Sequence, residues 1–297
     1  MSAGGPPDTG DRLLDPRPGR RSRILGGGLG AGVEGGRAVL IAMVSTVVFF
    51  ALVVIAVVNS PGWPEVSRLF FNGAQFRESL PVIGRAFFVN VLLFCTAEVF
   101  ILVFALLLAV LRSLRGPVFF PIRALAIGYV DLFRGVPTIL VITVLGFGAP
   151  ALGLAGVPKS EFFWAVVSLV LVYSAYVAEV YRAGIESVHE SQIGAARSLG
   201  LSRWQSMRFV VLPQAIRRVI PPLLNDFIGL QKDSALVATI GVVEAFRQAG
   251  IESAATFNFT PYLATAMLFV LVTIPLARLT DWLVSRERAR RQTGATA

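Results

Sequence analysis

The chain has 297 residues, of which 55% are hydrophobic and only 15% are charged, and its formal net charge is +9. Soluble domains carry about 25% charged residues, so this composition argues against a soluble enzyme and excludes a disordered chain. A single cysteine excludes an intrachain disulfide framework. We therefore expect an all-α integral membrane protein with several transmembrane helices.

The N-terminal region combines two different segments. Residues 1–37 are rich in Arg, Gly and Pro and lack hydrophobic periodicity, which predicts a disordered cytoplasmic tail. Residues 38–58 form an uncharged apolar run that exceeds the roughly 7–15 residues of a signal-peptide core, and no A-x-A cleavage site follows. We expect this run to be an extra N-terminal transmembrane helix that is retained in the protein.

Five further apolar segments are long enough to cross a membrane, which takes about 20 residues. They cover residues 85–111, 124–145, 162–181, 219–243 and 261–284. Pro221 and Pro222 are expected to break the helix in the 219–243 segment, because proline donates no backbone hydrogen bond. Residues 286–297 are expected to form a basic cytoplasmic tail.

Arginine residues gather in alternate connections between these six spans, a distribution that sets membrane orientation. Arginines are frequent before the first span, between the second and third, between the fourth and fifth, and after the sixth. We therefore expect a multi-pass protein of the bacterial plasma membrane with both termini in the cytoplasm. Since the positive charge is explained by topology, nucleic acid is excluded as a partner.

The chain lacks the usual motifs of an enzyme. Its two lysines, Lys159 and Lys232, do not follow a glycine, so there is no P-loop for ATP. His189 is the single histidine and has no second histidine or cysteine with which to bind a metal. We expect no catalytic residue, no metal site and no cofactor bound by this chain.

The connection over residues 186–213 is too polar to span a membrane, yet it carries helix signals. Ser187 with Glu190, and Ser202 with Gln205, both have the spacing of a capping box. Gly200 stands where a helix often ends in a left-handed residue. Two short cytoplasmic helices that meet at Gly200 are predicted.

This connection also offers a surface of small residues, Gly194, Ala195 and Ala196, which would allow close approach by another protein. The alternative is an amphipathic linker that lies on the lipid surface. The spacing from Gly194-Ala195-Ala196 to Gly200 and then to Leu212-Pro213 resembles the E-A-A-x3-G-x9-I-x-L-P loop of bacterial ABC-importer permeases.

Three other segments are similar to the polar amino-acid branch of that family. They are Y-V-D-L-F-R-G-V-P at 129–137, A-E-V-Y-R-A-G-I at 178–185 and L-Q-K-D-S-A-L at 230–236. The resemblance covers residues 80–285, which we expect to be the permease domain, a five-helix core. The chain departs from the family pattern where Gly194 replaces Glu, where Asp131 replaces Glu, and where Ser234-Ala235 replaces Thr-Ser.

The resemblance implies a permease subunit that imports polar amino acids, with glutamate, glutamine or a basic amino acid as its substrate. It implies separate ATPase subunits that bind ATP and Mg, a second permease subunit, identical or paralogous, and an extracytoplasmic solute-binding protein. The loop residues that it assigns to ATPase coupling are Gly194, Ala195, Ala196, Gly200, Leu212 and Pro213.

Ionisable residues inside a membrane are costly and therefore face protein or water. Glu98 shares a helix face with Asn90 and Phe94 and is expected to point into the bundle, either for transport or for a structural hydrogen bond. The resemblance places the fifth span along the translocation path. The candidate path residues are Glu98, Asn225, Asp226, Lys232 and Asp233, the alternative being polar contacts between helices.

Two pairs of opposite charges are spaced three residues apart, Asp131 with Arg134 and Glu179 with Arg182. We expect both to be structural ion pairs at the cytoplasmic boundary.

Three rival functions stay open. An ion-coupled secondary transporter would show two related halves with broken helices in corresponding positions, whereas only one polar, proline-containing span is apparent. A scaffold protein would not require the loop spacing. An ABC permease for another small solute is the narrower alternative.

Overall fold

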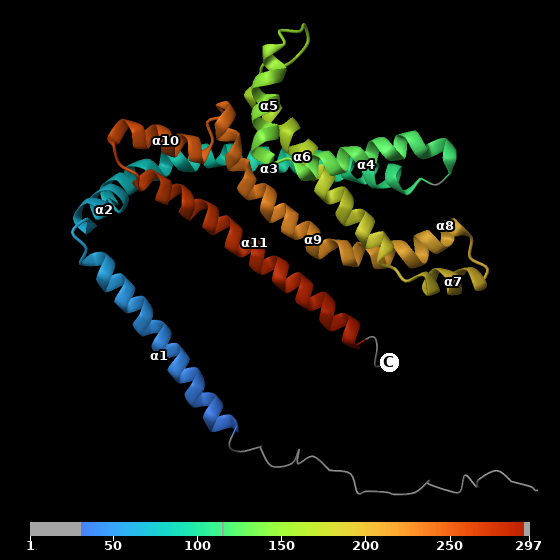
Figure 1. The fold of residues 1–297 in the computed structure, drawn as a ribbon, viewed down its shortest axis with the longest axis horizontal. Coiled ribbons are helices and arrows are strands. Elements are labelled where there is room, and N and C mark those ends of the chain that lie inside the picture. The colour runs from blue at the N-terminus through green and yellow to red at the C-terminus, as the bar shows by residue number, and fades with distance from the viewer. Residues whose placement is uncertain (1–30, 115, 294–297) are drawn as a thin grey trace, which may run out of the picture. The chain divides into compact units, whose positions relative to one another are not determined.

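The computed structural model describes residues 31–114 and 116–293, and the regular structure in these residues is helical throughout (Figure 1). The chain divides into two compact units, Met1–Trp63 and Pro64–Ala297. Each unit is described by itself.

The first unit contains helix α1 (Ala31–Val58). Its segment Gly36–Val58 has a mean hydropathy of 3.0 and is long enough to cross a membrane, as predicted for residues 38–58. The helix begins at Ala31, so residues 31–37 of the predicted tail are helical. A helix that is already nucleated extends at little cost, because each added residue gains one hydrogen bond. Residues 1–30 of that tail lie outside the described residues.

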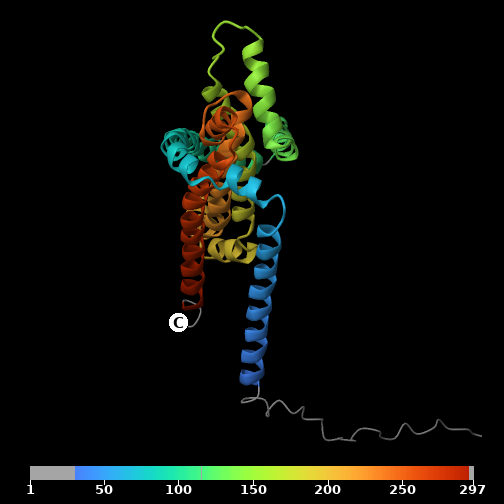
Figure 2. The same cartoon turned by 90° about the vertical axis from the view of Figure 1, so that its left-hand side faces the viewer.

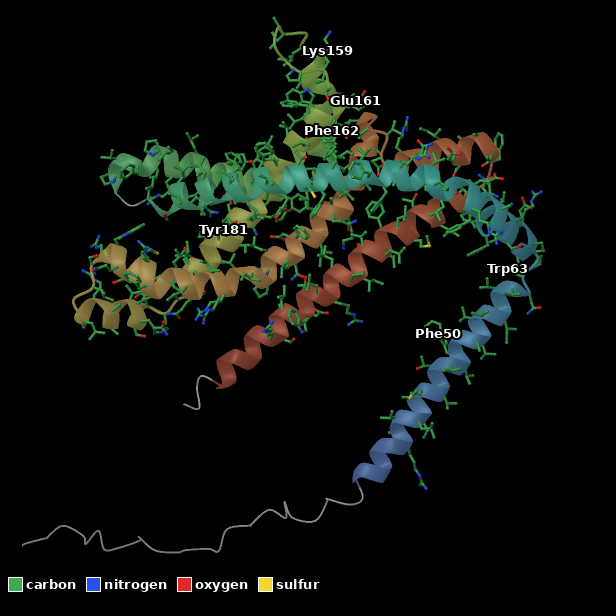
Figure 3. All side chains as sticks on the ribbon, turned by 180° about the vertical axis from the view of Figure 1, so that it is seen from behind. Phe50, Trp63, Lys159, Glu161, Phe162 and Tyr181 are labelled. Atoms are coloured by element: carbon green, nitrogen blue, oxygen red, sulfur yellow. The ribbon has the colours of Figure 1, made fainter. Side chains whose placement is uncertain are left out.

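The second unit is a bundle built around one central helix. The elements in chain order are α2 (Trp63–Phe70), α3 (Gly73–Ser113), η1 (Pro117–Phe119), α4 (Phe120–Gly135), α5 (Thr138–Ala151), α6 (Glu161–Glu186), α7 (Glu190–Ser198), α8 (Arg203–Ser206), η2 (Met207–Val211), α9 (Leu212–Asp233), η3 (Ser234–Ile240), α10 (Ala245–Thr256) and α11 (Thr260–Thr293). Figure 3 shows Lys159 and Glu161 at one end of α6 and Tyr181 toward its other end.

Helix α6 packs against α3, α4, α5 and α9 and lies at the centre of the hydrophobic core. Leu169 and Val172 of α6 are fully buried, as is Leu93 of α3. A Cβ atom on Gly184 would lie 2.1 Å from Val219 Cγ2, so glycine at this position lets α9 approach the C-terminal half of α6. The C-terminal part of α6 and the N-terminal part of α9 are therefore in direct contact.

The described residues contain the predicted six spans when each bent pair of helices is counted as one span. Four segments are long and apolar enough to cross a membrane alone, and two pairs of helices meet that criterion together. Figure 2, turned by 90°, shows α5 projecting beyond the other helices of the second unit.

The span predicted over residues 124–145 is made of two helices. Helix α4 ends at Gly135, α5 begins at Thr138, and the two are bent by 104°. Val136 has extended backbone dihedrals because the ring of the following Pro137 disfavours a helical conformation. The bend thus follows from a Val-Pro sequence.

The break expected at Pro221 and Pro222 is in the wrong place. Helix α9 continues through both prolines to Asp233 and passes into η3, and a 50° bend separates this run from α10. Gly241, with φ +100°, ends η3. Prolines are tolerated in membrane helices where neighbouring groups satisfy the freed backbone.

Helix α11 extends to Thr293, so residues 286–293 of the predicted basic C-terminal tail are helical. Residues 294–297 lie outside the described part.

Candidate functional site

The loop between α6 and α9 contains the two short helices that the sequence predicts. Gly200 has φ +84°, and the backbone N–H of Leu201 donates to Ala196 O at 3.2 Å, which ends α7 in a left-handed turn. Ser202 and Gln205 form the predicted capping box, with Ser202 N to Gln205 Oε1 at 2.8 Å and Gln205 N to Ser202 Oγ at 3.2 Å.

The capping box expected for Ser187 and Glu190 is absent. Ser187 ends α6, and its hydroxyl donates to Gly184 O at 2.6 Å. His189 caps α7 instead, because its Nδ1 accepts a hydrogen bond from Ser191 N at 3.2 Å. His189, and not Ser187, is therefore the N-cap of α7.

The surface of this loop differs from the predicted patch of small residues. Gly194 and Ala195 are exposed, but Ala196 is buried beneath them. The loop packs on a small apolar cluster that contains Val188 and Val211. Leu212 and Pro213 begin α9 and are exposed.

Three large apolar side chains on the loop were not recognised from sequence. Leu199 is 84% exposed, and Trp204 and Phe209 are exposed as well. Their presence in an otherwise polar segment was a readable signal, since exposed apolar clusters mark contact surfaces.

Glu179 on α6 is the centre of an ionic cluster. Arg112 of α3 donates to Glu179 Oε2 at 2.8 Å, and Arg182 donates to the same carboxylate and to Glu186. Arg134 of α4 lies 3.9 Å from Glu179 Oε2. The Glu179–Arg182 contact expected from spacing is therefore present, within a larger cluster that ties together the C-terminal parts of α3, α4 and α6.

The expected ion pair between Asp131 and Arg134 is not formed. Asp131 is exposed, and no oxygen of it lies within ion-pair distance of a basic group in the part of the chain described. Arg134 faces Glu179 instead and lies over the ring of Tyr176, 5.9 Å from its centroid. A partly buried carboxylate attracts a guanidinium more strongly than an exposed one, because the local dielectric is lower.

A cavity of about 320 Å³ lies beside this ionic cluster, between α6 and α9. Arg134, Glu179, Arg218 and Asp226 contribute its charged walls, and Tyr176 contributes an aromatic one. Asp226 Oδ2 is buried and accepts no hydrogen bond. Arg218 donates to Ser187 O, at the start of the α7–α8 loop. The cavity therefore presents both signs of charge and one unused acceptor.

The remaining candidate path residues of α9 fall on two faces. Asn225 and Lys232, seven residues apart, are both exposed. Asp226 and Asp233, also seven apart, are half-buried, and Tyr173 of α6 donates to Asp233 Oδ2 at 2.9 Å. The polar residues of α9 thus form two stripes, with the carboxylates turned toward α6.

Glu98 and its two companions on α3 separate into different environments. Glu98 is half-buried and close enough to Asp226 for their carboxylates to interact. Phe94 packs edge-on against Phe227 at 4.3 Å. Asn90 is fully buried in a polar network that the sequence analysis missed.

That network joins α3 to the turn before α10. Asn90 Nδ2 donates to Ser234 Oγ at 3.0 Å and to Glu244 Oε2 at 2.9 Å, while Asn90 Oδ1 accepts from Ala245 N at 3.0 Å. Glu244 is 0% exposed and also accepts from the backbone N–H groups of Phe246 and Arg247. An acidic residue ahead of a helical segment was the only sequence signal for this cap.

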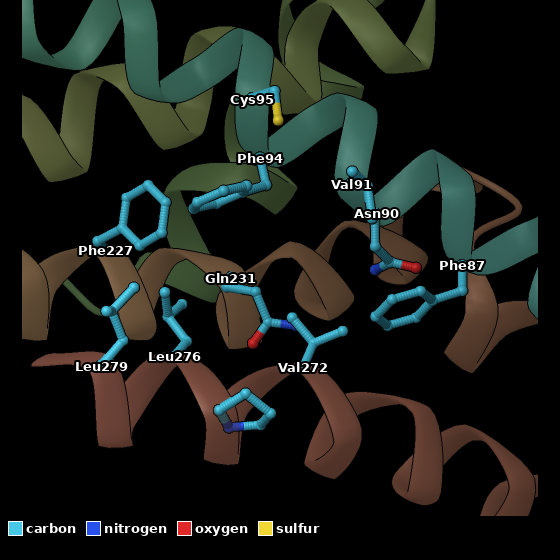
Figure 4. Close-up of a pocket in the computed structure, with 11 residues that line it drawn as sticks. Phe87, Asn90, Val91, Phe94, Cys95, Phe227, Gln231, Val272, Leu276 and Leu279 are labelled. Carbon is cyan, nitrogen blue, oxygen red and sulfur yellow. The ribbon is translucent and has the colours of Figure 1, made fainter.

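A second cavity, of about 380 Å³, separates α3, α9 and α11 (Figure 4). Its walls are mostly apolar, and Cys95 opens onto it. Gln231 is 5% exposed there. Its Oε1 accepts from Thr273 at 2.9 Å, and its Nε2 has no partner. The cavity lacks charged walls, so it differs in character from the one beside Asp226.

The chain was compared with proteins of known family. Residues 101–289 match the binding-protein-dependent transport system inner membrane component family. The chain is 33% identical over 204 residues to the probable amino-acid permease protein YxeN of Bacillus subtilis (strain 168). The aligned residues cover 68% of this chain and 90% of that protein. It is 37% identical over 175 residues to the arginine transport system permease protein ArtQ of the same organism, covering 58% and 79%.

Solved structures agree with this assignment. A crystal structure of an amino acid ABC transporter with histidines aligns with a TM-score of 0.67 and 30% sequence identity, covering 72% of this chain and 98% of that chain. The methionine transporter MetNI in an inward-facing conformation shares the fold, with a TM-score of 0.54 and 18% identity over 69% of this chain and 94% of that one. The chain therefore belongs to the binding-protein-dependent transport system inner membrane components, the multi-pass permease subunits of ABC importers, in which the ATPase is a separate subunit.

Proposed function

We propose that this permease imports polar amino acids, with glutamate, glutamine or a basic amino acid as the substrate, and that the cavity beside Asp226 lies on their path. The observation that carries the proposal is the buried Asp226 Oδ2, which lacks a partner in a cavity that Arg134 and Arg218 also line. An amino acid presents an ammonium and a carboxylate, and this cavity offers a group of opposite charge to each. The relatives named as amino-acid and arginine permeases support the substrate class.

The path runs along α9 and past Glu98. Asn225 and Lys232 on the exposed face of α9 would meet a second permease subunit across the path, while Asp226 and Asp233 face α6. A single core of about five helices is small for a gated path, which favours a pair of permeases, identical or paralogous. Both termini would lie in the cytoplasm, on the side of the arginine-rich connections.

The α7–α8 loop would transmit ATPase motion to this cavity. Gly194, Ala195, Gly200, Leu212 and Pro213 would lie at the ATPase contact, with Ala196 supporting them from below. Packed helices move as rigid bodies, so a shift of the loop would displace the cytoplasmic ends of α6 and α9 together. ATP and Mg would be bound by the ATPase subunits, and substrate would arrive on an extracytoplasmic solute-binding protein.

The proposal is tested by uptake of radiolabelled amino acids into proteoliposomes that hold the permease, its ATPase and its solute-binding protein. Asp226→Asn should lower ATP-driven uptake by roughly tenfold while the ATPase still co-purifies, because one hydrogen bond to a charged group is worth about 1.5–3 kcal/mol. Asp131→Asn is the matched control, since Asp131 is an exposed carboxylate on α4 and its loss should leave uptake near wild type.

Three results would contradict the proposal. Unchanged uptake in Asp226→Asn would remove the cavity from the path. Uptake driven by a proton or sodium gradient without ATP would instead indicate a secondary transporter, and uptake of peptides or osmolytes in place of amino acids would indicate another substrate class.

A further inference from the structure

Four aromatic rings from separate segments form a continuous ladder on the second unit. Phe70 of α2 stacks on Phe259 with ring centroids 5.1 Å apart, and Phe259 stacks on Tyr262 of α11 at 6.5 Å. Tyr262 in turn contacts Phe246 of α10 at 5.4 Å. Phe70, Phe246 and Phe259 are exposed despite these contacts. The ladder is therefore an apolar surface with one polar hydroxyl.

A strained residue extends this surface. Phe257 has φ +51°, the only positive φ of a non-glycine residue in the described ranges, and it ends α10 in the left-handed region. That conformation costs an L-residue with a Cβ roughly 1–2 kcal/mol, and glycine or asparagine usually occupies it. Its ring is 83% exposed, so the protein itself gives no compensating burial. Backbone strain that presents a bare aromatic ring indicates that something outside the chain covers the ring.

Three hydrogen bonds fix the ladder at the N-terminal end of α11. Phe259 N donates to Leu69 O at 2.7 Å, Asn258 Nδ2 donates to Arg68 O at 2.9 Å, and Asn72 N donates to Thr260 Oγ1 at 3.1 Å. Thr260 is the first residue of α11, whose segment Thr260–Arg286 is long and apolar enough to cross a bilayer. A bilayer crossed by this segment would have its interface between hydrocarbon and headgroups near the ladder and Phe257, because they adjoin the first residue of the segment.

Helix α2 has the pattern of a helix that lies in this interface. Val66 and Phe70, four residues apart, form an exposed apolar edge. Glu65 and Arg68 form an exposed ion pair at 2.7 Å on a different side of the helix. A short helix with an apolar edge and a charged side suits the boundary between lipid and water.

We infer that the aromatic ladder, together with Phe257 and the apolar edge of α2, inserts into the lipid interface and anchors the α10–α11 turn there. Phenylalanine, tyrosine and tryptophan rings concentrate at this depth in membrane proteins, where the ring is apolar and a hydroxyl can reach water. The occupant is the bilayer, because the surface begins within three residues of a transmembrane helix and its aromatic contacts carry no charge. The inference goes beyond the proposed transport of amino acids and does not depend on the substrate.

The test uses site-directed fluorescence on the full chain in phosphatidylcholine nanodiscs. Cys95 is the only native cysteine, so a Cys95→Ala background accepts a single introduced thiol. Phe257→Cys is labelled with a bimane and exposed either to phosphatidylcholine carrying a headgroup nitroxide or to aqueous iodide. Leu199→Cys is the matched control, because Leu199 is 84% exposed and Phe257 is 83% exposed, but Leu199 lies on the α7–α8 loop, which is proposed to contact the ATPase.

We expect the nitroxide lipid to quench the label at position 257 at least about twofold more than iodide does, with the order reversed at position 199. Stronger quenching by iodide at position 257 would overturn the inference and assign the ring to water. Protection of the label at position 257 from both quenchers in the assembled transporter would overturn it in favour of a protein contact. Phe246→Cys, on the same ladder, provides a second position if the Phe257 variant does not fold.

Discussion

Removal of the Glu244 carboxylate tests how the bent region before α10 is held. Glu244→Ala leaves three donors without their acceptor: Asn90 Nδ2, and the backbone N–H groups of Phe246 and Arg247, which now lie 2.9, 2.9 and 2.8 Å from the carboxylate oxygens. A buried donor left unsatisfied costs about 1–3 kcal/mol, so the three together set an upper range of roughly 3–9 kcal/mol. Because Asn90 can rotate and water can enter the space, we expect a loss of about 3–5 kcal/mol in the free energy of unfolding.

The assay combines reversible unfolding in mixed micelles with hydrogen exchange of α10. Glu244→Ala should lower the free energy of unfolding and deprotect the amides of Ala245–Thr256 before those of α6. Glu244→Gln is the graded comparison. Its carbonyl can still accept, but its NH₂ group faces donors, so the loss should be smaller, about 1–2 kcal/mol. Glu252→Ala, elsewhere on α10, removes a hydrogen bond from Gln248 that is not fully buried and serves as the control. Equal stability of Glu244→Ala and Glu252→Ala would refute the reasoning.

Three further substitutions probe the α7–α8 loop and the helices that it joins. Gly200→Val forces a β-branched residue to φ +84°, so co-purification of the ATPase should fall by roughly tenfold with membrane insertion unchanged. Gly128→Ala, on α4 and outside the loop, has nothing within 4 Å of the added Cβ and should retain the ATPase. Gly184→Ala places a Cβ 2.1 Å from Val219 Cγ2, so thermal unfolding should report a destabilisation of about 1–3 kcal/mol, and an unchanged midpoint would contradict the α6–α9 contact. Glu179→Ala leaves three guanidiniums without their shared carboxylate and should lower the free energy of unfolding by about 2–3 kcal/mol. This loss is smaller than that expected for a fully buried ion pair, and it should shrink in high salt.

Local signals were read correctly where the chain segment decides its own structure. The capping box of Ser202 and Gln205 and the left-handed Gly200 depend on neighbours within a few residues, and both are present. The number of spans follows from hydropathy alone. The bend after Gly135 also has a local cause, since Pro137 restricts the backbone of Val136. Hydropathy does not indicate this bend, because the apolar run continues through it.

Contacts between distant segments could not be read in this way. Arg134 has a carboxylate three residues away, yet it faces Glu179, 45 positions along the chain, because helix packing brings α4 against α6. Asn90 and Glu244 are separated by 154 positions, and no local sequence pattern around either residue indicates that the other is its partner. Likewise, spacing alone did not show that Asp226 and Asp233 turn toward α6 while Asn225 and Lys232 do not.

The α7–α8 loop and the charged cavity share structural elements, and this limits how the permease can move. Arg218 lines the cavity and also donates to Ser187 O, the residue that follows α6 before the loop. The loop packs through Val188 and Val211 onto Ala215 of α9, so the C-terminal end of α6, the N-terminal end of α9 and the loop form one packed unit. Glu179 adds the ends of α3 and α4 to the same wall of the cavity. A displacement of α7 and α8 therefore cannot leave the walls around Asp226 unchanged, because close packing transmits small shifts rather than absorbing them. In contrast, the Asn90–Glu244 network fixes the far end of α9 to α3, so that motion should pivot about the bend between η3 and α10.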